Sequence, residues 1–166
     1  MIVIGIDPGI AITGYGIIRQ EENEILTVVD YGAIVAPNSI RGDSERLLLI
    51  YQKLGEILTL HRPLAGAVEK LFFQKNVRTA MAVGQARGIA LLALAQKEIP
   101  LYEYAPVEIK HALTGYGNAD KRQIQEMVKL RLALREVPKP DDVADALAIA
   151  ICHLQSYRLR NFVEAG

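Results

Sequence analysis

IVIGIDPG, residues 2–9, opens the chain with the pattern on which the expected fold depends. Residues 2–6 are apolar and mostly β-branched, which favours a buried strand, and Pro8-Gly9 favours a turn directly after it. The strand therefore ends on Asp7, which places a carboxylate at the edge of a sheet. Asp is also a common turn residue, so this position alone does not assign a function to Asp7.

The pattern downstream predicts an α/β fold. Two more strands, residues 14–19 and 25–35, flank a polar turn and extend an antiparallel meander. Short apolar segments at 64–68 and 101–104 alternate with helices and predict further strands. The expected helices are residues 43–60 (with Asp43 or Ser44 as N-cap), 76–97, 106–113, 120–134 and 141 to about 160. We therefore expect one domain over residues 1–166, a mixed sheet flanked by helices.

The composition fits one buried core. Hydrophobic residues make up 51% of the 166 residues, and the longest apolar runs are shorter than the ~20 residues that span a bilayer. The N-terminus reads as a strand and not as a basic leader, so we expect a cytoplasmic protein with no membrane segment. Cys152 is the single cysteine, which excludes a disulfide framework and Cys/His zinc spacing and favours a buried thiol.

Charge is segregated although the formal net charge is zero. Residues 110–135 carry six cations against two acids, and residues 70–87 carry four cations and no acid. DNA responds to local potential, so such surfaces can bind phosphates on a neutral protein. An ordinary solvated helix face explains the same pattern, and charge alone leaves both readings open.

Four carboxylates form the strongest candidate site. Asp7 and Glu69 each end a strand, while Asp142 and Asp145 lie on one face of the last helix. Asp145 is surrounded by apolar residues, with no Arg or Lys within one turn, so burying its charge calls for a compensating cation. Mg²⁺ prefers carboxylate oxygen, and a pair of ions in such a site hydrolyses phosphodiesters. Without metal the carboxylates should repel one another and raise at least one pKa.

Simpler explanations exist for some of these acids. Asp141 and Asp142 stand where helix caps stand, so capping accounts for one of them. Glu69 at a strand end could face solvent. Asp145 is the acid that these explanations fit least well.

At this point the chain resembles the bacterial RuvC-type crossover junction endonucleases almost end to end. The matching motifs, in order, are Gly5-Ile6-Asp7-Pro8-Gly9, Thr13-Gly14-Tyr15-Gly16, Val68-Glu69, Phe72-Phe73-Gln74-Lys75-Asn76, Gly84-Gln85-Ala86-Arg87-Gly88 and Asp142-Val143-Ala144-Asp145-Ala146-Leu147-Ala148-Ile149-Ala150. The first motif alone is unspecific, because sugar kinases and actin-like ATPases open similarly. The last motif, in order with the others, is specific.

The resemblance implies an RNase H-like fold with a mixed five-stranded sheet: three antiparallel strands, then parallel strands. It also implies a homodimer that cuts Holliday junctions by paired symmetric nicks in recombination and DNA repair. The family hydrolyses DNA with two Mg²⁺ per site, with Mn²⁺ as a substitute, and leaves 5′-phosphate and 3′-hydroxyl ends. It acts beside a branch-migration motor complex and favours short thymine-containing sites.

Residue by residue, Asp7, Glu69, Asp142 and Asp145 fall on the family's catalytic, metal-binding carboxylates. Some members have histidine where Asp142 stands. Lys70 departs from the neutral or acidic residue of better-known relatives and would perturb Glu69 if it pointed toward it.

The DNA-contacting residues follow in the same way. Phe72 falls on the aromatic residue that stacks at the junction core, and Lys110 and Lys121 fall on junction-contacting lysines. From the residues themselves, either Phe72 or Phe73 can stack on a base while the other packs as a helix-entry staple. Lys75 and Arg87 in the basic run are further predicted DNA contacts.

Dimerisation has its own sequence signal. A two-fold target is matched most simply by a two-fold dimer. The helix over residues 76–95 carries more apolar surface than one core needs, at Ala80, Met81, Val83, Leu91, Leu92 and Leu94. We expect part of it to form the interface.

Two other classes of function stay open at this point. One is an actin-like or sugar-kinase-like ATP-using enzyme, which requires two lobes where 166 residues supply one. The other is a catalytically silent junction-binding relative, which predicts a lost or misplaced acid.

Overall fold

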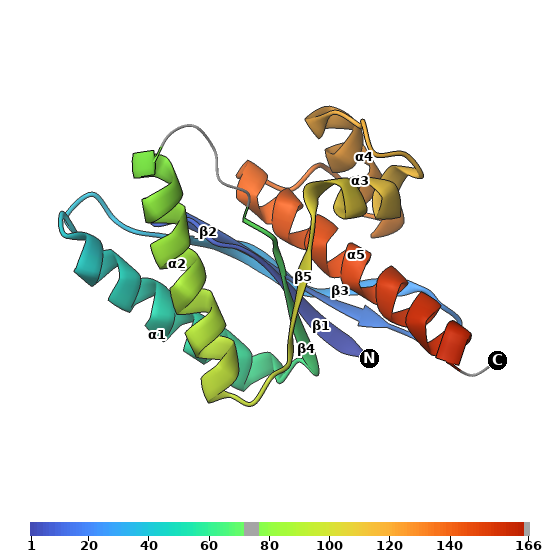
Figure 1. Ribbon diagram of the computed structural model, residues 1–166, viewed down its shortest axis with the longest axis horizontal. Coiled ribbons are helices and arrows are strands. Elements are labelled where there is room, and N and C mark those ends of the chain that lie inside the picture. Colours follow the sequence, from blue (N-terminus) through green and yellow to red (C-terminus); the bar gives the residue numbers. More distant parts are fainter. Residues whose placement is uncertain (72–76, 165–166) are drawn as a thin grey trace.

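A computed structural model describes residues 1–71 and 77–164 (Figure 1). After an initial run of three strands, helices and strands alternate as far as the fifth strand, and three helices follow it, as the sequence predicts. Their bounds are β1 Ile2–Asp7, β2 Ile12–Gln20, β3 Leu26–Val35, α1 Asp43–His61, β4 Ala65–Glu69, α2 Val77–Gln96, β5 Leu101–Tyr104, α3 Pro106–Thr114, α4 Lys121–Arg131 and α5 Asp141–Glu164.

One five-stranded sheet, in the order β3-β2-β1-β4-β5, forms the middle layer. β1 pairs antiparallel with β2, and β2 pairs antiparallel with β3. β4 runs parallel to β1, and β5 runs parallel to β4. The mixed sheet expected from the sequence is confirmed, including the change from antiparallel to parallel strands at β1.

Alternation along β1 supplies apolar side chains to both faces of the sheet. Val3 belongs to the core that contains the buried length of α5, whereas Ile4 and Ile6 belong to the core under α1 and α2. Successive side chains of a strand point to opposite faces, so a continuous apolar strand is what a sheet covered on both sides requires. Figure 1 shows α1 and α2 together on one side of the sheet, with α5 crossing the other.

Two glycines let α5 lie directly on the sheet. A Cβ atom built on Gly5 of β1 would come within 2.0 Å of the Ala146 carbonyl oxygen. One built on Gly14 of β2 would come within 2.0 Å of the backbone carbonyl oxygen of Asp142. No side chain fits at either position without moving the helix. The first turn of α5 is therefore held against the strands that end beside it.

Two local expectations are corrected by the structure. The N-cap of α1 is Gly42, with no side-chain cap hydrogen bond, and not Asp43 or Ser44, which are inside or at the start of the helix. α4 ends at Arg131, three residues earlier than expected, because Ala133 adopts a left-handed conformation with φ 49°. Within the described part of the chain, no helix has the length and apolarity needed to cross a membrane.

Gly5→Ala should destabilise the protein by about 1–3 kcal/mol or more, because the new methyl group forces α5 away from the sheet. Chemical denaturation measures the free energy of unfolding. Gly55→Ala in α1 is the matched control, since its added Cβ would meet nothing within 4 Å. It should leave stability unchanged or raise it by roughly 0.5–1 kcal/mol, as expected for Gly to Ala in a helix. Equal effects of the two changes would contradict this account of the α5 contact.

Candidate active site

Asp7 and Glu69 lie side by side at one edge of the sheet. β1 and β4 are parallel, and their last paired residues in register are Ile6 and Val68. The next residue on each strand is the carboxylate. The turn after Asp7 is fixed locally, because the Thr13 hydroxyl donates to the Gly9 carbonyl at 2.8 Å and accepts from the Gly9 amide at 3.3 Å.

α5 brings the other two acids to the same edge. The Asp142 backbone sits against Gly14, which is the β2 partner of Asp7. Asp145 follows by three residues and so lies on the same helix face, near the sheet. Asp7 and Asp145 are far apart in the sequence, and the packing of α5 against β1 and β2 brings them to the same region.

The charges of these acids act on one another. The pKa of Asp7 is raised from 3.8 to about 7, first by burial and then by the charges of Asp145, Asp142 and Glu69. Burial and then Asp145 raise the pKa of Glu69. Burial also raises the pKa of Asp145, against the opposing effect of Lys121. The expectation that a carboxylate pKa rises in the metal-free site is met most strongly at Asp7.

A lysine supplies counter-charge that was not evident from the sequence. The Lys121 ammonium lies 3.1 Å from Asp145 Oδ2 and 3.4 Å from Asp141 Oδ2. Asp145 was expected to need a divalent cation because no Lys or Arg lies within one turn of it. No Lys or Arg does lie within one turn, but α4 brings a cation from 24 residues away, so a divalent ion is not the sole source of counter-charge. Lys110 of α3 acts similarly on Glu69, where its charge opposes the rise in pKa that burial and Asp145 cause.

These groups surround a cavity of about 280 Å³ at the sheet edge. Asp7, Glu69 and Asp145 line it, together with Lys110 and Lys121. Apolar residues of α3, α4 and α5, such as Ile109, Ile124 and Ile149, complete the wall. Asp142 acts on the cavity through its charge and is not among its lining residues. The cavity lining thus combines carboxylates with lysines, and a lysine can contact a phosphate.

The donor chemistry of this site fits a hard divalent cation. All its anionic donors are carboxylate oxygens, and their mutual repulsion is what a bound cation relieves. Among the described residues, however, no three His, Cys, Asp or Glu side chains stand close enough to hold a metal ion. In the conformation seen here the ammonium of Lys121 provides the counter-charge, so metal binding would require these side chains to rearrange.

The predicted DNA-contacting residues are distributed unevenly. Lys110 and Lys121 come together at the cavity, whereas Phe72 and Lys75 lie outside the described residues, as does Phe73. Arg87 of α2 forms an ion pair with Glu103 of β5, and its side chain is 12% exposed. A DNA contact by Arg87 would require this ion pair to open, and its role stays a prediction.

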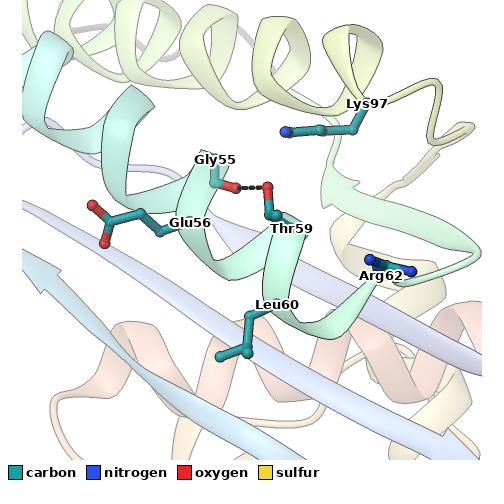
Figure 2. A pocket seen from close by; sticks show the side chains of 6 residues that line it. All are labelled: Gly55, Glu56, Thr59, Leu60, Arg62 and Lys97. Carbon is teal, nitrogen blue, oxygen red and sulfur yellow. Dashed lines mark hydrogen bonds between the residues drawn. The ribbon is translucent and has the colours of Figure 1, made fainter.

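A larger surface hollow is remote from these acids in the fold. It has a volume of about 760 Å³ and lies at the C-terminal ends of α1 and α2 (Figure 2). Arg62 and Lys97 line it, but its single carboxylate, Glu56, pairs with Lys53 at 2.8 Å. The Thr59 hydroxyl donates to the Gly55 carbonyl within its own helix. Because it gathers no set of interacting acids, the smaller cavity is the better candidate site.

Asp141 is another acid close to the site, through its contact with Lys121. Besides Lys121, it contacts Lys139 Nζ at 3.6 Å, and Gln125 Nε2 donates to its Oδ1 at 3.1 Å. Lys121 holds the pKa of this carboxyl below its usual range. Its position at the start of a helix suggested only capping. No pattern within α5 signals contacts that come from α4.

Comparisons with known proteins agree with this geometry. A protein-family model described as "Crossover junction endodeoxyribonuclease RuvC" matches residues 3–153. A protein of that name from Chloroflexus aggregans is 56% identical over 153 residues, 92% of each chain. Another from Caldicellulosiruptor saccharolyticus is 52% identical over 156 residues, 94% of this chain and 93% of the relative.

A solved structure matches as well. It is described as T. thermophilus RuvC in complex with Holliday junction substrate, and it superposes with a TM-score of 0.89 at 36% identity, covering 96% of both chains. The RNase H-like fold that the sequence motifs implied is thereby confirmed.

Asp7→Asn should stabilise the metal-free protein at pH 8 and have little effect near pH 4. The folded protein keeps a proton on Asp7 between pH 3.8 and about 7, so native stability falls as pH rises through that window. A pKa that moves from 3.8 to about 7 corresponds to at most about 4 kcal/mol. Thermal melts in EDTA across this range measure the difference. For the exposed acid Glu22, Glu22→Gln should show no such trend, and a flat difference for Asp7→Asn would refute the shared environment.

Proposed function

The chain belongs to the RuvC family of crossover junction endodeoxyribonucleases, and on this premise we propose that it resolves four-way DNA junctions by hydrolysing paired phosphodiesters. The observation that carries the proposal is that Asp7, Glu69 and Asp145 line one cavity together with two lysines. Acids suited to a divalent cation and lysines suited to phosphate are the two components such a reaction needs. Family membership also favours this function over an ATP-using enzyme.

The substrate follows from the relative of known structure. The T. thermophilus protein is described in complex with a Holliday junction, and it covers nearly all of this chain at 36% identity. We extend that substrate to this chain, with the whole of residues 1–166 acting as one nuclease domain in the cytoplasm. Cooperation with a branch-migration motor complex belongs to the same proposal.

Two Mg²⁺ ions per site, or Mn²⁺ in their place, are the proposed cofactors. The residues that would hold them are Asp7, Glu69, Asp142 and Asp145. Their carboxylate oxygens fit hard cations, and Lys121 offsets only part of the repulsion that raises the pKa of Asp7. When bound, such ions activate water for in-line attack and stabilise the leaving 3′ oxygen, which gives 5′-phosphate and 3′-hydroxyl ends. All four acids are present, and the charges of Asp142, Asp145 and Glu69 all act on Asp7, which argues against a catalytically silent relative.

The chain's own residues would bind and orient the DNA. Lys110 and Lys121, on opposite sides of the α3–α4 turn, can each neutralise a backbone phosphate without reading sequence. Asp7 is the most buried of the acids, whereas Glu69 at the end of β4 is exposed and can be reached by solvent and DNA. Stacking by Phe72, and DNA contacts by Lys75 and Arg87, are further parts of the proposal that rest on the family resemblance.

A homodimer through α2 is proposed for the symmetric cuts. Among the apolar residues singled out from the sequence, Leu94 is buried in the core, but Met81 and Leu92 are 63% and 55% exposed. Val77, Met81, Gly84, Gly88 and Leu92 recur at intervals of three or four and so share a face. Added Cβ atoms on the two glycines would meet nothing within 4 Å, which leaves room for a second helix to approach closely.

Asp145→Asn and Asp7→Asn should each abolish cleavage of a synthetic four-way junction while leaving junction binding in place, because they remove cation ligands and not phosphate contacts. Cleavage by the unmodified protein should give paired symmetric nicks with Mg²⁺, none with EDTA, and none on matched linear duplex. Labelled strands on denaturing gels report the nicks and their end groups. Asp43→Asn, in the exposed first turn of α1, is the control. Normal cutting by Asp145→Asn would sink the proposed mechanism.

Met81→Glu should convert a dimer into a monomer, because it places a charge in the middle of the proposed α2 interface. Light scattering after size exclusion should give twice 18.3 kDa for the unmodified protein and 18.3 kDa for the variant. Leu130→Glu changes a comparably exposed apolar residue on α4 and should leave the mass unchanged. An unmodified protein that is monomeric at micromolar concentration would refute this dimer.

A further inference from the structure

Asp141 lies just outside the cavity but is connected to it through Lys121. It is the first residue of α5, its side chain is 48% exposed, and it does not line the cavity. It is also not one of the four carboxylates assigned to cation binding. Its charge is nevertheless engaged by Lys121 and Lys139, and its Oδ1 accepts from Gln125.

The Lys121 ammonium is shared between one acid that lines the cavity and one that does not. Lys121 Nζ lies 3.1 Å from Asp145 Oδ2, inside the cavity, and 3.4 Å from Asp141 Oδ2, outside it. The side chain is 55% exposed, so solvent and DNA can both reach it. A phosphate that takes this ammonium must draw it away from one or both carboxylates.

We propose that Asp141 is a positioning residue that holds Lys121 beside the carboxylates and competes with DNA phosphate for its ammonium. The inference rests on the proposed function, since it assumes that Lys121 meets DNA. Gln125 and Lys139 contact the same carboxylate and restrict where it can turn, so its oxygen is already placed for Lys121. Asp141 thereby weakens DNA binding through Lys121 for as long as Asp145 carries no cation and both acids attract the ammonium.

The contact is exposed, which limits the size of the effect. Exposed ion pairs contribute little individually, and the corresponding change in an equilibrium constant is about two- to fivefold. An acid at a helix N-terminus also stabilises the helix. That general effect alters folding stability, but it does not predict that the influence of Asp141 on DNA depends on Lys121.

A double-mutant cycle separates these possibilities. Polarisation of a labelled four-way junction, in EDTA so that nothing is cut, gives the dissociation constants of the unmodified protein, Asp141→Asn, Lys121→Met and the double variant. Asp141→Asn should tighten binding about two- to fivefold when Lys121 is present and have no effect with Lys121→Met. Asn keeps an oxygen that can accept from Gln125, so the local structure is preserved. Melting temperatures of all four proteins verify that they are folded.

Two controls address charge in general. Asp141→Glu restores the carboxylate and should return binding to that of the unmodified protein. Glu136→Gln removes an exposed acid from the segment before α5 and should leave the Lys121 dependence untouched.

The inference about Asp141 is overturned by equal tightening with and without Lys121, or by no tightening when Lys121 is present, while the unmodified protein still prefers the junction to linear duplex. Absence of that preference in the unmodified protein would instead refute the proposed function, and the role of Asp141 with it.

Discussion

The close contact between α5 and the sheet is the constraint from which the site follows. Gly5 and Gly14 remove the side chains that would separate the helix from β1 and β2. Because the helix lies this near, its first two turns bring Asp142 and Asp145 up to the strand ends that carry Asp7 and Glu69. Ordinary packing, with a side chain between the layers, would keep these charges farther apart. The glycines therefore determine electrostatics as much as packing.

This proximity has an energetic cost that the fold tolerates. Burial and three neighbouring acids raise the pKa of Asp7 to about 7, which means that its ionised form destabilises the native state. The buried cores on both faces of the sheet offset that cost. Many functional sites lower the stability of the unbound protein because the groups that serve binding or catalysis repel one another there.

The sequence predicts what short-range pattern determines. β1, β4 and β5 are evident from apolar runs that stop at Asp7, Glu69 and Tyr104, and the acids were singled out because two of those runs end on carboxylates. The sequence does not predict two details of the backbone. Gly42 is the N-cap of α1 and makes no side-chain cap hydrogen bond, and the left-handed conformation of Ala133 ends α4 early. Neither leaves a periodic signal, since each depends on how the chain enters or leaves a helix in three dimensions.

The contact between Lys121 and Asp145 shows why charge compensation is harder to predict than charge placement. An acid in an apolar helix signals that a partner is needed, but the partner can come from any element that the fold brings near. Here it comes from the first turn of α4, where Asp120 caps the helix and Lys121 donates to Asp145 of α5. The same ammonium that pairs with Asp145 is one of the two that we propose to meet a DNA phosphate. Binding of a cation to Asp145 and binding of DNA phosphate to Lys121 would each favour the other, because both break the ion pair between Lys121 and Asp145.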